Sequence, residues 1–246
     1  MPPADASTGS GAGPTPHPGG GTEDTIDLRL TDELTALFGE GGPAVVLPRP
    51  APAPAAGDLL DTPGGWGTTL TSAGVFQLVP VCIERDLSLV SRWMNDPAVA
   101  AFWELAGPES VTAAHLRPQL DGDGRSVPCL GVLRGIPMSY WEIYRADLDP
   151  LARHYPARPH DTGIHLLLGS VADRGRGVGT TLLRAVSELI LDHRPRCGRV
   201  IAEPDLRNTP SVSAFLSAGF RFFAEADLPD KRAALMVRDR ALRDLL

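Results

Sequence analysis

A glycine-rich loop between a buried strand and an amphipathic helix is the segment best suited to chemistry. Residues 164–169 read Ile-His-Leu-Leu-Leu-Gly, and residues 174–180 read Arg-Gly-Arg-Gly-Val-Gly-Thr. The first N–H groups of a helix lack partners, and the helix dipole favours an anion there. Glycines let a phosphate lie against the backbone, and Arg174 and Arg176 add positive charge. The pattern predicts a phosphate site, although the same glycines also suit a tight strand–helix connection.

Two other phosphate motifs do not match this loop. No Gly-Lys-Ser or Gly-Lys-Thr follows the glycines, which excludes a nucleotide-hydrolysing loop. The spacing differs from the dinucleotide fingerprint, and no acidic residue ends the next strand at the ribose position, although Glu203 and Asp205 come close. Cys82, Cys129 and Cys197 are far apart and lack zinc-ligand spacing, so no metal site is expected.

The net charge lies in the first third of the chain. Residues 1–80 hold 2 basic and 9 acidic side chains, whereas residues 81–246 hold 21 of each. A neutral body behind an acidic segment argues against a nucleic-acid binder. No apolar run approaches about 18 residues, and the N-terminus lacks the basic and apolar regions of a signal peptide. Together with three scattered cysteines, these features predict a cytoplasmic protein without membrane partners.

Composition also divides the chain into three parts. Residues 1–25 are rich in Gly, Pro, Ser and Thr and are expected to be disordered. Residues 26–74 form an N-terminal extension and linker, and residues 75–246 form the main domain. The elements expected in the extension are a helix over 32–38, a strand over 44–47, a stiff segment over 48–56 and a hairpin-like stretch over 66–72.

Strand and helix patterns alternate within residues 75–246. The expected strands cover residues 75–81, 127–134, 137–145, 163–169, 199–203, 220–226 and 233–238. The expected helices cover residues 86–95, 98–105, 110–120 and 180–193, with one more between Asn208 and Gly219. Asp86 and Asn208 are expected to cap their helices. This order predicts an α+β or α/β sandwich on one mixed sheet.

Several motifs resemble those of the GNAT acyltransferases. Arg174-x-x-Gly177-x-Gly179 is similar to the loop that binds the acyl-CoA pyrophosphate in that superfamily, and Asn208 with Ala218-Gly219-Phe220 is similar to its second segment. The chain from about Phe76 to Arg238 more specifically resembles the siderophore branch, which acylates hydroxylysine, hydroxycadaverine or lysine side chains on the way to hydroxamate iron chelators. The segments that carry this closer match are Trp93-Met94-Asn95-Asp96-Pro97 with Phe102-Trp103, Ser139-Tyr140-Trp141-Glu142-Ile143-Tyr144, Asp161-x-Gly163-Ile164-His165-Leu166-Leu167 and Glu203-Pro204-Asp205-x-x-Asn208.

The resemblance implies a GNAT-like, mostly antiparallel sheet flanked by helices, with acetyl-CoA or another acyl-CoA as co-substrate and no metal. The residues that it places on the CoA are Leu167, Leu168, Arg174, Gly175, Arg176, Gly177, Val178, Gly179, Thr180 and Asn208. A backbone N–H near Leu167 or Leu168 is expected to face the thioester carbonyl. The resemblance makes His165 a substrate or base residue and Asp205 the proton acceptor, as a His–Asp pair. Alone, His165 also suits a core histidine and Asp205 a helix cap.

Aromatic and acidic residues are candidates for the acceptor site. Tyr140 and Glu142 share one face of their strand, and Trp141 takes the other. With Trp103 they would hold an aliphatic amine chain, and Glu142 would bind its distal ammonium. Trp103 and Trp141 are equally compatible with core packing. Phe215 stands where many GNAT enzymes have a tyrosine acid, so protonation of the leaving thiolate falls to His165 or water.

Three functions remain open at this stage. The first is CoA-dependent N-acylation of an N-hydroxylated diamine or lysine-like amine for a siderophore used in iron acquisition. The second is a small-amine or aminoglycoside N-acetyltransferase, which the balanced charge of residues 81–246 mildly disfavours because aminoglycosides are polycations. The third is a non-catalytic acyl-CoA-binding module, against which the presence of His165 and Asp205 counts. The acyl donor is either CoA or an acyl carrier protein.

Overall fold

The computed structural model describes residue 60 and residues 63–245. The segment expected to be disordered, the helix expected over 32–38, the strand expected over 44–47 and the stiff segment expected over 48–56 lie outside the described residues. Every strand and helix expected from residue 75 onward is present within about three residues of its expected bounds. The hairpin-like stretch over 66–72 corresponds to the first strand and the turn that follows it.

Eight strands of the described part form one mixed sheet, in the spatial order β1-β2-β3-β4-β5-β6-β8-β7. They are β1 (Thr68–Thr71), β2 (Gly74–Pro80), β3 (Ser126–Leu133), β4 (Ile136–Arg145), β5 (Thr162–Leu168), β6 (Arg199–Ala202), β7 (Arg221–Asp227) and β8 (Arg232–Asp239). All neighbours pair antiparallel except β5 and β6, which are parallel. The expected mostly antiparallel GNAT-like sheet is therefore confirmed.

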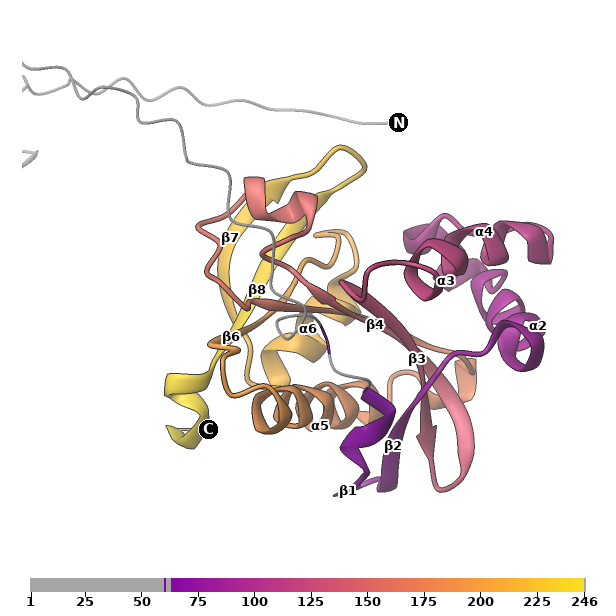
Figure 1. Ribbon diagram of the computed structural model, residues 1–246, viewed down its shortest axis with the longest axis horizontal. Coiled ribbons are helices and arrows are strands. Elements are labelled where there is room, and N and C mark those ends of the chain that lie inside the picture. Colours follow the sequence, from indigo (N-terminus) through magenta and orange to yellow (C-terminus); the bar gives the residue numbers. More distant parts are fainter. Residues whose placement is uncertain (1–59, 61–62, 246) are drawn as a thin grey trace, which may run out of the picture. The chain divides into compact units, whose positions relative to one another are not determined.

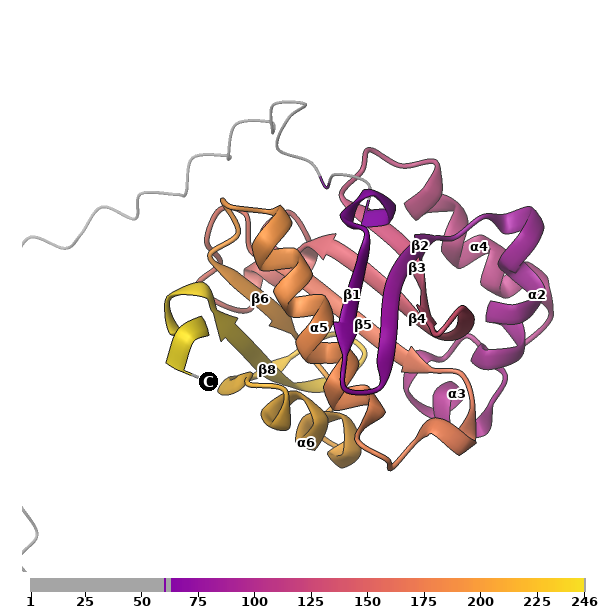
Figure 2. The same ribbon diagram turned by 90° about the horizontal axis from the view of Figure 1, so that it is seen from below.

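Helices cover both faces of this sheet (Figures 1 and 2). The α-helices are α2 (Ile83–Met94), α3 (Pro97–Trp103), α4 (Glu109–Leu120), α5 (Val178–His193) and α6 (Thr209–Ser217). Short 3-10 turns are η2 (Pro63–Trp66), η3 (Pro150–Arg153), η4 (Val171–Asp173) and η5 (Arg240–Leu245). Helices α5 and α6 lie on one face, and α2, α3 and α4 gather over the other. No helix of the described part is long and apolar enough to cross a membrane.

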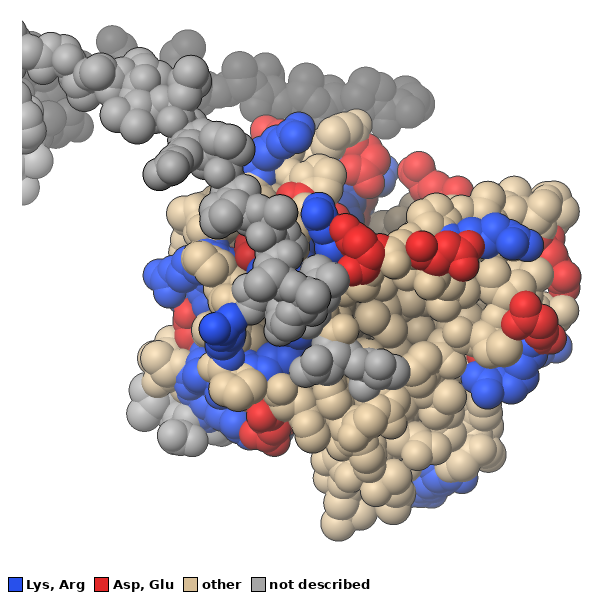
Figure 3. All heavy atoms as spheres, viewed as in Figure 1, with Lys and Arg blue, Asp and Glu red and all other residues tan. Residues whose placement is uncertain are grey.

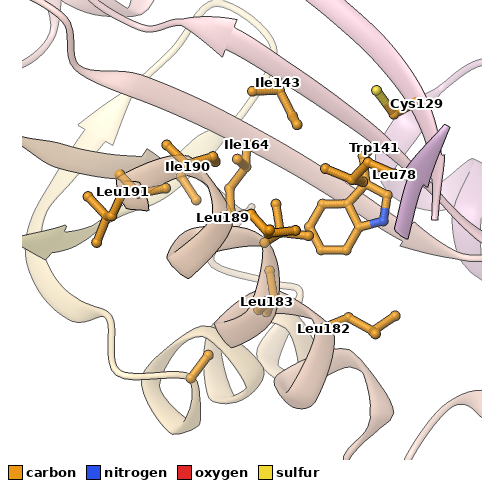
Figure 4. Close-up of a cluster of buried hydrophobic side chains, with 14 of the residues drawn as sticks. Leu78, Cys129, Trp141, Ile143, Ile164, Leu182, Leu183, Leu189, Ile190 and Leu191 are labelled. Carbon is orange, nitrogen blue, oxygen red and sulfur yellow. The ribbon is translucent and has the colours of Figure 1, made fainter. Parts of the chain in front are cut away.

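The main core lies between α5 and the sheet (Figure 4). Leu182, Leu183 and Ile190 form the apolar stripe of α5 and pack on Ile164 of β5 and Trp141 of β4, all fully or almost fully buried. Burial of each such side chain contributes about 1.5–3 kcal/mol. A second cluster joins α2, α3 and α4 to the opposite face through Val90, Met94, Leu116 and other apolar residues. The two clusters hold β4 and β5 rigidly in the centre of the sheet.

The expected start of α2 is wrong by about one turn. Its N-cap is Cys82, and Asp86 lies inside the helix, 3% exposed. The Asp86 carboxylate accepts the Cys82 N–H at 2.9 Å, so it still satisfies a backbone donor of the first turn from within. Asp96 behaves as a regular cap for α3, because it accepts the Ala98 N–H at 3.0 Å and Pro97 occupies the first helical position.

Several large apolar side chains lie at the ends of the strand hairpins. Leu70 and Val75 of the β1–β2 hairpin and Ile136 of the β3–β4 hairpin are among the most exposed. The space-filling view shows a broad, largely uncharged area on this part of the molecule, while charged groups gather elsewhere (Figure 3). The β3–β4 turn uses Arg134 and Gly135, both with positive φ, as a tight two-residue hairpin requires.

Strands β5 and β6 separate soon after they meet. Their pairing covers only Thr162 with Val200 and Gly163 with Ile201, whereas β5 continues to Leu168. From Ile164 onward β5 therefore has β4 on one edge and no strand on the other. This opening in the centre of the sheet positions the candidate site.

Candidate active site

A cleft of about 810 Å³ follows the open edge of β5. Apolar residues of α3 and β5 line one part, and the glycine loop and α6 line the rest. The predicted CoA residues that line it are Leu167, Leu168, Arg174, Gly175, Gly177, Gly179, Thr180 and Asn208. Arg176 is exposed outside this lining, and Val178 packs against the main core. The cleft thus unites most of the predicted CoA site.

The glycine loop leaves open backbone at the start of α5. Gly175 and Gly177 have φ of 70° and 76°, a region that favours glycine. A Cβ at either position would meet nothing within 4 Å. Gly177 is the N-cap of α5 and carries no side-chain cap, so N–H groups of the first turn remain available to an anion. This arrangement fits a CoA pyrophosphate.

Arg174 lines the cleft, and its guanidinium is held by contacts within the protein. Its Nη1 donates to Asp96 Oδ1 at 2.8 Å, and its Nη2 donates to the carbonyl oxygen of Leu168 at 2.9 Å. The guanidinium therefore ties the glycine loop to the cap of α3 and to the end of β5. Its charge is already paired with Asp96, whose pKa it lowers, so Arg174 shapes the loop rather than offering an unpaired cation to a phosphate.

The open edge of β5 exposes alternate peptide groups. Gly169 N–H donates to Met138 O of β4 at 2.8 Å. Since N–H directions alternate along an antiparallel strand, Leu167 N–H also points to β4, and those of Leu166 and Leu168 point to the opening. Of the two residues predicted to face the thioester, Leu168 is therefore correctly oriented and Leu167 is not. Leu166 is the additional donor that the structure reveals.

Helix α6 forms the far wall of the cleft. Asn208 caps it and accepts the Ser211 N–H at 3.2 Å, as expected. Phe215 also lines the cleft and packs edge-on against Phe220, with ring centroids 5.0 Å apart. The side chain of Phe215 has no proton to give, so this wall supplies no tyrosine acid at that position.

His165 lies between two carboxylates. Its Nδ1 bonds Glu142 Oε2 at 2.7 Å, and its Nε2 bonds Glu203 Oε1. Glu142 is the register partner of His165 on β4, whereas Glu203 directly follows β6 on the other side of the opening. The imidazole thus bridges the two diverging strands at the inner end of the gap between them. Tyr144 Oη donates to the second Glu203 oxygen at 2.7 Å.

These contacts determine the charge of His165. Burial alone would lower its pKa, but the two carboxylates Glu203 and Glu142 outweigh burial and raise it to about 10. For Glu203, burial opposes ionisation, yet His165, Lys231 and Tyr144 lower its pKa to about 2. At neutral pH the group is therefore an imidazolium held by two carboxylates. A protonated imidazole donates hydrogen bonds and accepts a proton only after it has lost one.

The expected pairing of His165 with Asp205 is wrong. Asp205 accepts the Arg207 N–H at 2.7 Å and also bonds the Arg207 guanidinium, which lowers its pKa. The physical reason is local, because Pro204 ends the strand path and Asp205 then stabilises the following turn. Glu203, two residues earlier, takes the place at His165. Lys231, the chain's one lysine, lies 3.7 Å from Glu203.

Glu142 is held by a second layer of side chains. His115 Nε2 lies 2.5 Å from Glu142 Oε1, and Gln119 and Tyr140 each donate to that oxygen at 2.8 Å. Burial opposes its ionisation, but His115 and His165 lower the pKa of Glu142 well below its usual range. The sequence analysis did not identify these helix residues. Their spacing of four positions on α4, which puts both on one helix face, was the available signal.

The two candidate tryptophans have different positions. Trp103 is half-buried, lines the cleft and contacts the rings of Tyr140 and His165 edge-on, with centroids 5.6 and 6.0 Å away. Trp141 is fully buried in the main core, where its Nε1 donates to Ser139 Oγ at 2.9 Å (Figure 4). The expected face alternation is confirmed, and Trp141 is corrected to a core residue.

A smaller pocket of about 270 Å³ opens beside His165. Its lining includes His165, Glu142, Tyr144 and Asp149, together with polar residues at the start of β3. His165 lines this pocket and its ring contacts Trp103, which lines the large cleft, so the two spaces lie on either side of this ring contact. No group of His, Cys, Asp and Glu among the described residues forms a candidate metal site.

Residues 82–228 match the family model described as the acetyltransferase (GNAT) domain, which spans more than half of the chain. The chain therefore belongs to the GNAT acetyltransferases. The resemblance to the siderophore branch is also confirmed, since its curated relatives are named as acyltransferases of lysine and of hydroxylated amines.

Two relatives illustrate this similarity. Lysine N-acyltransferase MbtK of Mycolicibacterium paratuberculosis is 38% identical over 159 residues, covering 65% of this chain and 72% of the relative. N(6)-hydroxylysine O-acetyltransferase of Escherichia coli is 37% identical over 155 residues, covering 63% and 49%.

Solved structures show the same fold. An uncharacterized protein from Bacillus halodurans has a TM-score of 0.68 and 30% identity, with coverage of 73% of this chain and 92% of that one. Aminoglycoside acetyltransferase AAC(6')-Ib, solved with coenzyme A, has a TM-score of 0.59 and 23% identity, covering 69% and 98%.

Proposed function

We propose that this chain is an acyl-CoA-dependent N-acyltransferase that acylates an N-hydroxylated diamine or a lysine-type amine in hydroxamate siderophore biosynthesis. The observation that carries the proposal is that two different spaces adjoin at the contact between His165 and Trp103. The large cleft has the open backbone and apolar wall that suit CoA and its acyl group. The small pocket has the carboxylates that suit an amine. The names of the relatives support the same reaction class.

The acyl donor would lie along the open edge of β5. The first-turn N–H groups of α5 would hold the pyrophosphate, and Leu166 or Leu168 N–H would donate to the thioester carbonyl. That donor would stabilise the oxyanion that forms when the nitrogen attacks. Collapse of this intermediate forms the amide or hydroxamate and breaks the carbon–sulfur bond, and the thiolate then takes a proton from water or from His165.

The acceptor would enter through the small pocket. A hydroxylamine nitrogen is largely uncharged at neutral pH and needs little help to become a nucleophile. The site must still accept the proton that the nitrogen loses after attack. Asp205 is the acceptor implied by the family resemblance, and Glu203 is the carboxylate placed against His165. Both are buried and both are ionised at neutral pH, so each is a chemically suitable candidate.

The size of the pocket favours a small acceptor. Its volume of about 270 Å³ lies just below the range of about 300–1,000 Å³ typical of drug-sized ligands. A lysine-sized amine suits it better than an aminoglycoside.

The test is a thiol-release assay with acetyl-CoA and succinyl-CoA against hydroxylysine, hydroxycadaverine, hydroxyornithine, lysine and an aminoglycoside. Asp205→Asn and Glu203→Gln are compared with Asp227→Asn, a matched control at an exposed position on β7. We expect turnover of a hydroxylamine or lysine, lost in at least one active-site variant and retained in the control. Turnover of the aminoglycoside alone, or CoA binding without turnover even from acyl carrier protein, contradicts the proposal.

A further inference from the structure

The small pocket beside His165 has a basic residue at its other end. His165 and Glu142 line it, and so do Arg125 and Ser126, which lie on or next to the start of β3, two strands away from β5. Asp149 also lines the pocket, so carboxylates gather near His165. Burial, and to a smaller extent the charges of Glu203 and Glu142, raise the pKa of Asp149. The pocket is therefore acidic where the nitrogen reacts and basic further away.

The strand register gives the separation of these two ends. Pro128, Glu142 and His165 lie in one row across β3, β4 and β5, and Arg125 precedes that row by three residues. With strands about 4.8 Å apart and a rise of about 3.3 Å per residue, the Cα atoms of Arg125 and His165 are about 14 Å apart. Both residues line the pocket, and their side chains are long enough to cover part of this distance. The remaining space suits a short aliphatic chain with a different charge at each end.

Arg125 is available to a ligand in a way that the neighbouring arginine is not. Arg145 also lines the pocket, but its side chain is buried and its guanidinium makes two bonds of 2.8 Å to Asp147. Arg125 is about half exposed and pairs with Asp123, itself exposed, at 2.7 Å. Ion pairs between exposed side chains are weak and exchange readily. A ligand carboxylate could therefore replace Asp123 on the guanidinium.

We propose that Arg125 binds the α-carboxylate of the acceptor, so that the preferred acceptor is a basic amino acid rather than the corresponding diamine. This inference rests on the proposed function and specifies its substrate class. The planar guanidinium matches a carboxylate with two parallel hydrogen bonds. The ω-nitrogen then lies at His165, Glu142 and Asp149. Asp149 has one oxygen on the Leu151 N–H, which leaves the other for an amine or hydroxylamine proton.

The experiment compares hydroxylysine with hydroxycadaverine, which differ only in the α-carboxylate. Initial rates of thiol release with acetyl-CoA give kcat/KM for each acceptor with the wild type, Arg125→Ala and Arg125→Lys. Arg117→Ala on α4 removes an exposed arginine outside the pocket lining. Asp123→Ala removes the ion-pair partner of Arg125 and leaves the Arg125 guanidinium in place.

We expect the wild type to prefer hydroxylysine by about 10- to 100-fold, the range for a charge-assisted hydrogen bond. Arg125→Ala should reduce this ratio to about one by weakening hydroxylysine alone, and Arg125→Lys should keep part of it. Arg117→Ala should keep the wild-type ratio, and Asp123→Ala should keep or raise it, because it removes the carboxylate that competes for Arg125. Equal use of both acceptors by the wild type, preference for hydroxycadaverine, or an equal loss on both acceptors in Arg125→Ala overturns the inference while the proposed function stands. No turnover of either acceptor, or of any other amine tested, overturns both.

Discussion

His165 and Glu203 form an ion pair across the point where β5 and β6 separate. The pair joins the two strands where their own hydrogen bonding has ended, next to the opening that exposes Leu166 and Leu168. Glu142 holds the second ring nitrogen, so the imidazolium has a fixed orientation as well as a fixed charge. A protonated histidine therefore lines the pocket proposed for the acceptor and lies beside the cleft proposed for the donor.

Substitution of Glu203 should change the pH dependence of the reaction. In the wild type, His165 has a pKa of about 10 and stays protonated through neutral pH. Glu203 raises the pKa of His165 more than Glu142 does, so Glu203→Gln should let the His165 pKa fall toward its ordinary value of 6.5. The pH profile of kcat/KM should then gain a transition between about pH 6.5 and 10. Glu225→Gln, on the exposed β7 strand, should keep the wild-type profile, and identical profiles for Glu203→Gln and the wild type would falsify this charge assignment.

The same contacts make stability depend on pH with a defined sign. The pKa of His165 is raised on folding, so its contribution is fully present below about pH 6.5 and is lost as the pH rises through about 10. The pKa of Glu203 is lowered to about 2, so its contribution is present above about 4.5 and is lost as the pH falls toward 2. Urea unfolding across this range should show both losses. His165→Asn should remove the loss of unfolding free energy at alkaline pH. If this loss is unchanged in the variant, the His165–Glu203 ion pair is not its source.

The proposed role of the glycine loop in CoA binding can be tested by comparing two glycines that have the same left-handed backbone conformation. Gly177 and Gly135 both have positive φ and open space where a Cβ would lie, but only Gly177 lines the cleft. Alanine at either position should cost about 1–2 kcal/mol of stability. Only Gly177→Ala should also weaken CoA binding, by about tenfold in Kd, because it disturbs the first turn of α5. Calorimetric titration with CoA measures this, and equal affinities of the two variants would argue against the loop as the pyrophosphate site.

Substitution of Trp141 should mainly lower stability, whereas substitution of Trp103 should mainly lower activity. Trp141→Phe removes a core indole and its bond to Ser139, so the free energy of unfolding should fall by about 1–3 kcal/mol. Trp103→Phe alters a half-buried ring that contacts His165 and the cleft, so kcat/KM should fall while stability changes little. Urea unfolding and thiol release on both variants check this. The reverse pattern would return Trp141 to the acceptor site.

The fold could be predicted closely because its signals are local. The apolar stripe of α5, the cap at Asn208 and the turn at Gly135 each follow from the spacing of nearby residues. The start of α2 was misplaced since Asp86 caps from inside the first turn, a position that looks like an N-cap in sequence. Patterns that mark an element do not always mark its first residue.

Most residues that line the cleft were named from the glycine loop and the family resemblance, whereas the contacts of His165 were not. That Tyr140 and Glu142 share one face followed from strand alternation. The partner of His165 on this side is whichever residue of the Glu203-Pro204-Asp205 segment turns toward β5. Strand alternation does not predict that residue, because the strand ends within this segment. His115 and Gln119 reach Glu142 from a distant helix, so only tertiary packing reveals them.

The central claim is acyl transfer from CoA to the nitrogen of a small hydroxylamine or lysine-type acceptor beside His165. The most direct measurement is mass spectrometry of the product formed from acetyl-CoA and hydroxylysine, with ferric ion added to detect a hydroxamate. We predict a product heavier by one acetyl group that forms a coloured ferric complex, made by the wild type and formed more slowly by Glu203→Gln or Asp205→Asn. An enzyme that binds CoA yet acetylates neither hydroxylysine nor any related amine would contradict the account.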